Sequence, residues 1–186
     1  MYRNQFQLTT PDALYSDGDR YMPALAVTKD LGSFLPSIKN VLVLGTGLGS
    51  MVRVMKKKGY EPRYTLVEKD KVVLQWALEL ADTEVAGKID PVCDDAGDFM
   101  QRNTKKYDLV FIDVFNGRVV PEFVSTPDFL KQCRDSLAQG GYLAFNYIVN
   151  DVQEWEQLQN IFAGIFPGYH VFSKSINRIL ISAPKP

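Results

Sequence analysis

The chain has 186 residues, of which 46% are hydrophobic and 23% charged, and its formal net charge is −1. This length and composition are typical of one globular domain with a sizeable core. Lysines and arginines are spread along the chain, so we expect no nucleic acid and no anionic membrane as a partner.

The N-terminus contains Arg3 but no apolar signal-peptide region, and no apolar run approaches the roughly 20 residues of a membrane span. The two cysteines, Cys93 and Cys133, lack metal-ligand spacing, which predicts free thiols in a cytoplasmic protein without a metal. His170 is the only histidine. This argues against Ser-His-Asp, Cys-His and multi-histidine metal sites.

In chain order, residues 1–37 are turn-rich and then helical from Pro23 to Leu35, and we expect them to form an appendage over one end of a sheet. Residues 38–186 are expected to form the main domain, in which β-rich runs alternate with helical patterns. Strands are predicted at 40–45, 63–68, 88–93, 107–115 and 142–148, and helices at 49–60, 69–82, 95–103, 126–141 and 151–166. Two β runs, 169–176 and 177–184, close the chain as an antiparallel hairpin.

This alternation predicts an α/β fold with a doubly wound, mostly parallel seven-stranded sheet and a C-terminal antiparallel hairpin. The apolar face of helix 69–82 is predicted to comprise Val72, Val73, Trp76, Ala77 and Leu80. Helix 126–141 is expected to begin at Pro127 and to stop at Gly140.

The run "VLVLGTGLGS" (41–50) places Gly45, Gly47 and Gly49 after the first strand of the sheet. Ligands of such sheets bind outside the carboxyl ends of the strands, where a glycine-rich turn lets a cofactor approach the backbone. The run lacks the lysine and the spacing of a phosphate loop. Its GxGxG spacing also departs from the dinucleotide pattern GxGxxG, although Ser50 stands at the last position of that pattern. A tight turn without a ligand is the structural alternative.

Three carboxylates lie at or near the carboxyl ends of the next predicted strands. Glu68 comes 23 residues after Gly45, and a carboxylate there can accept hydrogen bonds from the ribose hydroxyls of a nicotinamide or an S-adenosyl cofactor. Asp95, followed by Ala96, can accept from an adenine amino group or simply cap the next helix. Asp113 ends an apolar run, where an unpaired carboxylate is costly, so we expect it to have a functional role.

These runs, with "YTLVEKDKVV", "DDAGDFM", "YDLVFIDVFNG" and "TPDFLKQCRDSLAQGGYLAFN", resemble the spermidine synthase family within the class I S-adenosylmethionine-dependent methyltransferases. The resemblance implies a Rossmann-like fold, S-adenosylmethionine or its decarboxylated form as cofactor, a small-molecule acceptor and a homodimer. It implies these site residues: Gly45, Gly47, Gly49, Glu68, Asp95, Ala96 and Asp113 for the cofactor, with Asp113 and Asn116 as catalytic residues.

Two positions depart from the family pattern of polyamine synthases. Leu48 stands where those enzymes carry an acidic residue in the glycine loop, and Asn116 stands where they carry a second aspartate. Both changes disfavour a cationic diamine, which needs paired negative charge. The sequence therefore favours methyl transfer to a small acceptor, with Asp113 as base or amine orienter and Asn116 as a hydrogen-bonding group.

Three alternatives remain: polyamine aminopropyl transfer, a nicotinamide oxidoreductase and a non-catalytic cofactor-binding protein. We expect Tyr21 and Tyr147 to pack with their hydroxyls in water, although either can wall an acceptor pocket. We expect no catalytic role for His170.

Overall fold

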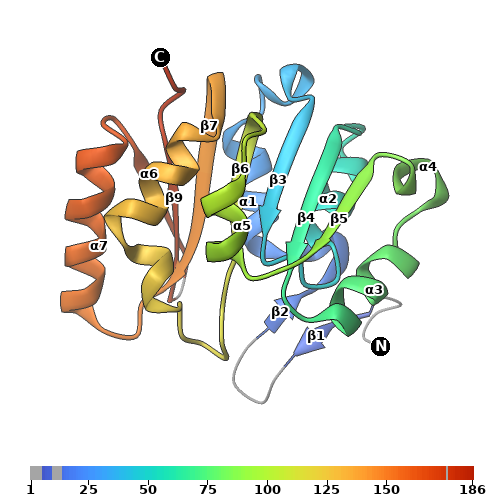
Figure 1. Cartoon of the computed structure of the whole chain (residues 1–186), viewed down its shortest axis with the longest axis horizontal. Helices are drawn as coiled ribbons and strands as arrows, with labels where there is room; N and C mark the ends of the chain where they lie inside the picture. Colours follow the sequence, from blue (N-terminus) through green and yellow to red (C-terminus); the bar gives the residue numbers. More distant parts are fainter. Residues whose placement is uncertain (1–5, 10–13, 175) are drawn as a thin grey trace.

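The computed structural model describes residues 6–9, 14–174 and 176–186. Its centre is a seven-stranded sheet in the order β5-β4-β3-β6-β7-β9-β8 (Figure 1). Five strands run parallel: β3 (Asn40–Leu44), β4 (Arg63–Glu68), β5 (Ile89–Cys93), β6 (Tyr107–Ile112) and β7 (Leu137–Ile148). The antiparallel hairpin of β8 (His170–Lys174) and β9 (Asn177–Ile181) completes the sheet, which confirms the predicted fold.

Helices cover both faces of this sheet (Figure 1). One core contains side chains of α1 (Met22–Asp30) and α2 (Ser50–Lys57), and the other contains side chains of α5 (Ala96–Arg102), α6 (Pro127–Asp135) and α7 (Val152–Ile165). In β3, Val41 and Val43 enter the first core while Leu42 and Leu44 enter the second. A central parallel strand buried on both faces reads as a continuous apolar run, which is why its prediction succeeded.

Helix α1 is packed into the first core. Ala24, Val27 and Leu31 are at most 1% exposed and belong to the same cluster as Val41. The predicted helix from Pro23 to Leu35 is therefore a shorter α1, followed by the 3₁₀ turn η2 (Leu35–Ser37). The expected division between residues 1–37 and 38–186 stays a prediction.

The short strands β1 (Leu8–Thr9) and β2 (Leu14–Ser16) pair with each other beyond the carboxyl ends of β3 and β4 (Figure 1). The 3₁₀ turn η1 (Gly18–Arg20) leads from them to α1. Within the described part of the chain, no helix has both the length and the apolar character that crossing a membrane requires.

The prediction of a helix over 126–141 was wrong at its C-terminal end. Helix α6 stops at Asp135 and β7 begins at Leu137. Residues 138–141 form a bulge in β7, where Gly140 has a φ of +74° and donates its N–H to the carbonyl of Lys185 at 2.8 Å. Pairing with strands distant in the sequence thus overrides the local helical pattern.

The region after β4 also differs from expectation. The predicted helix 69–82 is α3 (Lys71–Glu79), capped by Asp70, and the short helix α4 (Thr83–Ala86) follows it. The buried side chains of α3 are Leu74 and Ala77, whereas Val72 and Trp76 are 54% and 48% exposed. The predicted apolar face was therefore right for Ala77 and wrong for Val72 and Trp76, because apolar residues occur on more than one side of this helix.

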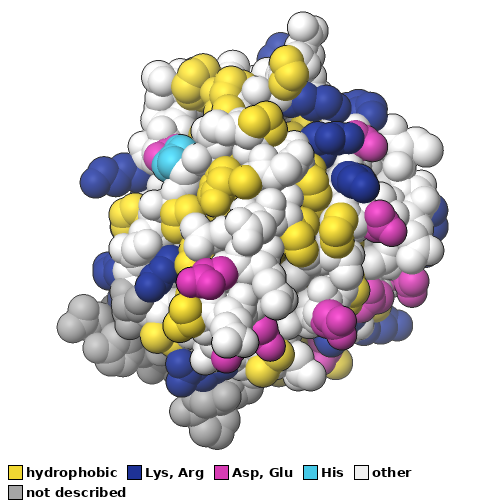
Figure 2. Space-filling model, turned by 90° about the vertical axis from the view of Figure 1, so that its left-hand side faces the viewer, with side chains coloured by type: hydrophobic (Ala, Val, Ile, Leu, Met, Phe, Trp, Pro, Cys, Tyr) yellow, Lys and Arg dark blue, Asp and Glu magenta, His cyan; other side chains and the backbone are white. Residues whose placement is uncertain are grey.

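His170 on β8 forms a hydrogen bond with Asp30 of α1, with 2.7 Å between Nε2 and Oδ1. Figure 2 shows the histidine beside an acidic side chain on the molecular surface. This contact ties the sheet edge to the helix layer, and His170 lines none of the cavities described below.

Candidate functional site

A cavity of about 280 Å³ lies where the carboxyl ends of β3, β4, β5 and β6 meet the N-terminal hairpin. Of the predicted site residues, Gly45, Gly47, Glu68, Asp95, Ala96, Asp113 and Asn116 line it. Tyr15 and Tyr21 form the wall on the N-terminal side. The structure thus brings together every predicted site residue except Gly49.

The three glycines all have left-handed backbone conformations, with φ of +81° at Gly45, +51° at Gly47 and +77° at Gly49. A Cβ on Gly45 would lie 2.3 Å from the carbonyl oxygen of Asp113, so this glycine lets the β3 and β6 ends approach each other. Gly49 instead caps the N-terminus of α2. Close backbone packing explains Gly45, and the left-handed cap conformation explains Gly49, where a Cβ would meet nothing nearer than 4.0 Å. Gly47 lines the cavity, and a Cβ there would lie 3.2 Å from the carbonyl oxygen of Tyr15.

Glu68 is held in place by two backbone N–H groups. Its Oε2 accepts from Gly47 at 3.2 Å, and its Oε1 accepts from Asp70 at 3.1 Å. Each carboxylate oxygen has a second lone pair, so Glu68 retains the capacity to accept hydrogen bonds from two hydroxyls.

Asp95 is the N-cap of α5, with its Oδ1 accepting from the N–H of Gly97 at 2.8 Å. The structural alternative for this residue is therefore confirmed. Asp94 accepts from the N–H of Asp95 and pairs with Arg102. No described residue bonds the Oδ2 of Asp95, so a role toward an adenine amino group stays a prediction compatible with the cap.

Asp113 lies at the centre of a side-chain network. Its Oδ1 accepts from the Tyr21 hydroxyl at 3.1 Å and from Nδ2 of Asn146 at 2.8 Å. The Oδ1 of Asn146 in turn accepts from Nδ2 of Asn177 at 3.1 Å. Residues from β7, β9 and the N-terminal segment therefore fix one oxygen of the carboxylate.

Burial raises the pKa of Asp113 to about 7, because the cavity wall removes water from its charged form. The hydrogen bonds from Asn146 and Tyr21 act in the opposite direction, and the charge of Glu68 adds to the rise. Burial, followed by the charge of Asp113, also raises the pKa of the Tyr21 phenol well above its ordinary value. A pKa of about 7 allows Asp113 to exchange a proton near neutral pH.

Sequence reasoning missed two members of this network. We expected the Tyr21 hydroxyl to lie in water, which was wrong, because it donates to a carboxylate 92 positions later in the chain. Asn146 was not singled out at all, although a buried Asn within the apolar run "YLAFNYI" is a usable signal. Tyr147 packs against Phe145 and Trp155 on the other side of β7 and is 5% exposed, so the packing part of its prediction is confirmed.

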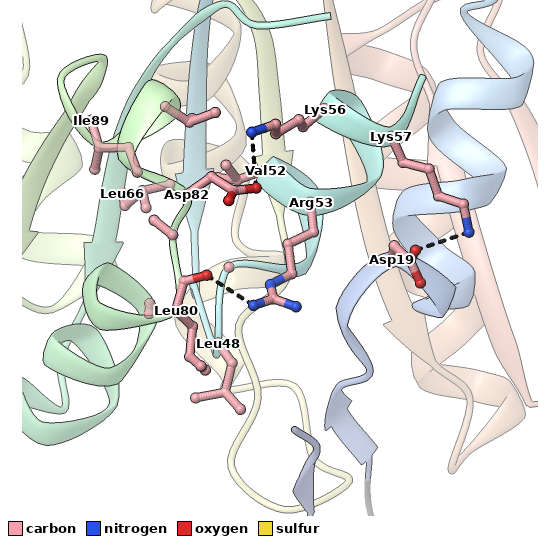
Figure 3. A pocket seen from close by; sticks show the side chains of 14 residues that line it. Asp19, Leu48, Val52, Arg53, Lys56, Lys57, Leu66, Leu80, Asp82 and Ile89 are labelled. Carbon is pink, nitrogen blue, oxygen red and sulfur yellow. Dashed lines mark hydrogen bonds and ion pairs between the residues drawn. The ribbon is translucent and has the colours of Figure 1, made fainter. Parts of the chain in front are cut away.

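A larger cavity of about 490 Å³ lies between α2 and the α3–α4 segment (Figure 3). The charged side chains around it are already engaged: Lys56 with Asp82, Lys57 with Asp19, and Arg53 with the carbonyl of Leu80. Of the predicted site residues it contains only Gly49. The smaller cavity at the strand ends is therefore the candidate site.

Two curated proteins resemble long stretches of this chain. A polyamine aminopropyltransferase of Vibrio vulnificus (strain CMCP6) is 27% identical over 168 residues, which is 87% of this chain and 56% of that protein. An N-terminal histidine N-methyltransferase of Emericella nidulans is 30% identical over 143 residues, which is 73% of this chain and 25% of that protein. The chain thus spans about half, or less, of the length of these relatives.

Solved structures share its fold. A probable spermidine synthase from Corynebacterium glutamicum has a TM-score of 0.75 at 24% identity, with 95% of this chain and 67% of that chain covered. Human methyltransferase-like protein 13, solved in complex with SAH, has a TM-score of 0.72 at 19% identity, with 89% and 80% covered. Both carry the Rossmann-like fold of the class I methyltransferases, and these similarities establish the fold alone.

The family assignment comes from the sequence. A family model described as "Spermine/spermidine synthase domain" matches residues 26–161, which include all the predicted site residues. The chain therefore belongs to the spermine/spermidine synthase family.

Proposed function

We propose that this chain binds S-adenosylmethionine at the candidate site and transfers its methyl group to a small acceptor. The observation that carries the proposal is the convergence of Gly47, Glu68, Asp95 and Asp113 on one cavity at the ends of parallel strands. Relatives of the chain include a methyltransferase and an aminopropyltransferase, so group transfer is common to both.

The residues of the cavity suit an S-adenosyl group. Glu68 is oriented by two N–H groups and can accept from the ribose hydroxyls. Asp95 can accept from the adenine amino group through its Oδ2 while its Oδ1 keeps the cap of α5. The bound cofactor supplies a methyl group on a positively charged sulfur, which keeps the electron pair when the acceptor takes the carbon.

Asp113 is proposed to hold the acceptor and to take up its proton. Tyr21 and Asn146 both donate to Oδ1, so Oδ2 remains for an amine or hydroxyl of the acceptor. A carboxyl whose pKa is about 7 is suited to proton transfer near neutral pH. Asn116 lines the same cavity and can orient the acceptor by hydrogen bonding, but it cannot take a proton.

The second candidate is polyamine synthesis with decarboxylated S-adenosylmethionine, which the Vibrio relative's activity favours. Two features of this site disfavour it. Leu48 stands where polyamine synthases carry an acidic residue, so this position provides no negative charge for an amine. Leu48 is only 6% exposed and lines the larger cavity of Figure 3. Asn116 provides no charge for a cationic amine. Methyl transfer therefore remains the first proposal.

Ligand-induced stabilisation tests the proposal. Thermal unfolding is measured with S-adenosylmethionine, decarboxylated S-adenosylmethionine, methylthioadenosine and NAD in turn. A ligand present at about 100 times its Kd stabilises the folded state by roughly 2.7 kcal/mol. We expect the largest shift with S-adenosylmethionine. A larger shift with the decarboxylated form would support polyamine synthesis, whereas a response to NAD alone, or to none of the four, would contradict both candidates.

A matched pair of variants tests whether this binding occurs at the candidate site. Asp95→Ser keeps an N-cap of comparable quality but removes the carboxylate. We expect it to weaken S-adenosylmethionine binding about tenfold while the melting temperature without ligand changes little. Asp98→Ser, one turn further along α5 and outside the cavity, serves as the control and should leave the affinity unchanged.

A further inference from the structure

A third and smaller cavity adjoins the candidate site. Its volume is about 160 Å³, and Tyr15, Tyr21 and Phe115 line both cavities. Asn146, which donates to Asp113, also belongs to its wall. If the transfer reaction proposed above is correct, the reacting group of the acceptor lies beside Asp113 in the candidate site, and the rest of the acceptor extends past Tyr21 and Phe115 into this cavity.

Arg118 gives this cavity its charge. Among the described residues that line it, Arg118 is the only charged one, and no aspartate or glutamate is present. The Nε of Arg118 is buried, and no described group accepts a hydrogen bond from it. Within the described part of the chain, its guanidinium also forms no ion pair. Because an arginine stays charged and no carboxylate lines this cavity, the described wall carries a positive charge that no acidic side chain neutralises.

The backbone holds Arg118 in place. Asn116 and Val119 exchange two backbone hydrogen bonds, of 2.8 and 3.1 Å, across a tight turn in which Gly117 has a φ of +63°. The carbonyl of Arg118 accepts from Nδ2 of Asn150 at 2.8 Å, which joins this turn to the loop after β7. The arginine is thus carried by a turn fixed at both sides, so binding would require little further ordering of the chain.

We propose that the acceptor bears an oxyanion group, a carboxylate or a phosphate, that pairs with Arg118. The planar guanidinium donates two parallel N–H groups to such an anion and so fixes both its position and its orientation. A diamine would instead bring a second positive charge to a wall without a carboxylate. This cavity therefore favours a negatively charged group on the acceptor, whereas a polyamine synthase must bind a positively charged one.

Titration of simple anions tests the inference. The Nε–H signals of the arginines are followed in ¹⁵N–¹H spectra while acetate, inorganic phosphate, 4-aminobutyrate or 1,4-diaminobutane is added, with and without SAH. The signal of Arg118 is assigned by its absence in Arg118→Lys. Acetate and phosphate distinguish the two oxyanions, and 4-aminobutyrate and the diamine differ chiefly in one charged end.

We expect an anion to shift the Arg118 signal, and 4-aminobutyrate to bind at least tenfold more tightly than the diamine. Arg118→Gln should weaken anion binding at least tenfold, whereas Arg134→Gln, a surface variant on α6, should leave it unchanged. The absence of any anion that binds in an Arg118-dependent way, or a preference for the diamine, would overturn the proposal.

The remaining arm separates this inference from the proposed function. If Arg118→Gln weakens the binding of SAH but not of methylthioadenosine, Arg118 pairs with the carboxylate of the cofactor and the proposal on the acceptor is wrong. If the wild-type protein does not bind SAH, the proposed function is refuted. Anion binding to Arg118 in the protein without SAH is measured independently of that result.

Discussion

At the scale of single residues, the charge of Asp113 affects both stability and chemistry. Burial raises its pKa from 3.8 to about 7 in the folded protein. Folding therefore takes up a proton between these two values, and the free energy of unfolding falls as the pH rises from about 4 to 7. The loss is at most on the order of 4 kcal/mol, because each pKa unit corresponds to about 1.4 kcal/mol.

Asp113→Asn should remove this fall in the free energy of unfolding, because an amide does not ionise. The amide keeps an oxygen that can accept from Tyr21 and Asn146, so the network is preserved. Urea unfolding at pH 4 and pH 8.5 should show similar stability of the variant and the wild type at pH 4, and a more stable variant at pH 8.5. Asp128→Asn, on the 91% exposed Asp128 side chain, is the control. A difference in the free energy of unfolding between variant and wild type that does not depend on pH would show that Asp113 is ionised with an ordinary pKa.

Tyr21→Phe tests the interaction that lowers the pKa of Asp113. The tyrosine hydroxyl donates to the charged form of Asp113 and holds its pKa down against burial. Without that bond the pKa of Asp113 should rise by about one unit, since a hydrogen bond to a charged group contributes about 1.5–3 kcal/mol. The side-chain carboxyl signal of Asp113 in ¹³C spectra measures the titration directly. Tyr147→Phe, which has no bond to Asp113, should not change it, and an equal shift in both variants would exclude the hydrogen bond as the cause.

The site residues could be predicted from the sequence where a local pattern carries the information. Glu68, Asp95 and Asp113 each lie at or near the carboxyl end of a predicted strand, and the carboxyl ends of parallel strands meet at one edge. Tyr21, Asn146 and Arg118 could not be placed in this way. Their roles depend on contacts between segments that lie far apart in the chain, and no periodicity encodes such contacts.

At the scale of elements, too, features carried by a local pattern were predicted, and features that depend on distant contacts were not. The buried strands β3 and β6 were predicted because both faces are covered and their residues are apolar throughout. The end of α6 was misplaced because "SLAQGG" has helical character, yet its residues pair with Tyr107 and Lys185. The face of α3 was misjudged because the helix has more apolar residues than its buried stripe needs.

The bulge in β7 gives a prediction at this scale. A Cβ on Gly141 would lie 2.9 Å from the carbonyl oxygens of Ala138 and Tyr107, which are both backbone atoms. Gly141→Ala should therefore lower the free energy of unfolding by about 2 kcal/mol, because the strand must move to accommodate the methyl group. Chemical denaturation followed by circular dichroism measures the change.

Gly164→Ala is the matched control for this variant. Gly164 lies within α7, and a Cβ there meets nothing within 4 Å. The substitution should raise the free energy of unfolding by roughly 0.5–1 kcal/mol, since alanine is the better helix former. If both substitutions stabilised the protein, the close backbone approach at Gly141 would be refuted.

At the scale of the whole molecule, the N-terminal residues decide whether the chain unfolds as one unit. The sequence predicts residues 1–37 as an appendage, whereas Leu31 is 1% exposed in a core shared with Val41 and Ile179. Both cores meet at the central sheet, so loss of one should destabilise the other. A single cooperative transition is therefore expected.

Leu31→Ala tests this expectation in a Trp76→Phe background, where Trp155 is the sole tryptophan and packs against Tyr147 beside the second core. The cavity left by Leu31 should lower the global free energy of unfolding by about 2–5 kcal/mol. The transition seen by Trp155 fluorescence should then move together with that seen by circular dichroism. Leu25→Ala, within α1 but 37% exposed, should move both transitions far less. If the Trp155 transition stayed in place while helical signal was lost earlier, residues 1–37 would fold as a separate unit and the boundary at 37/38 would hold.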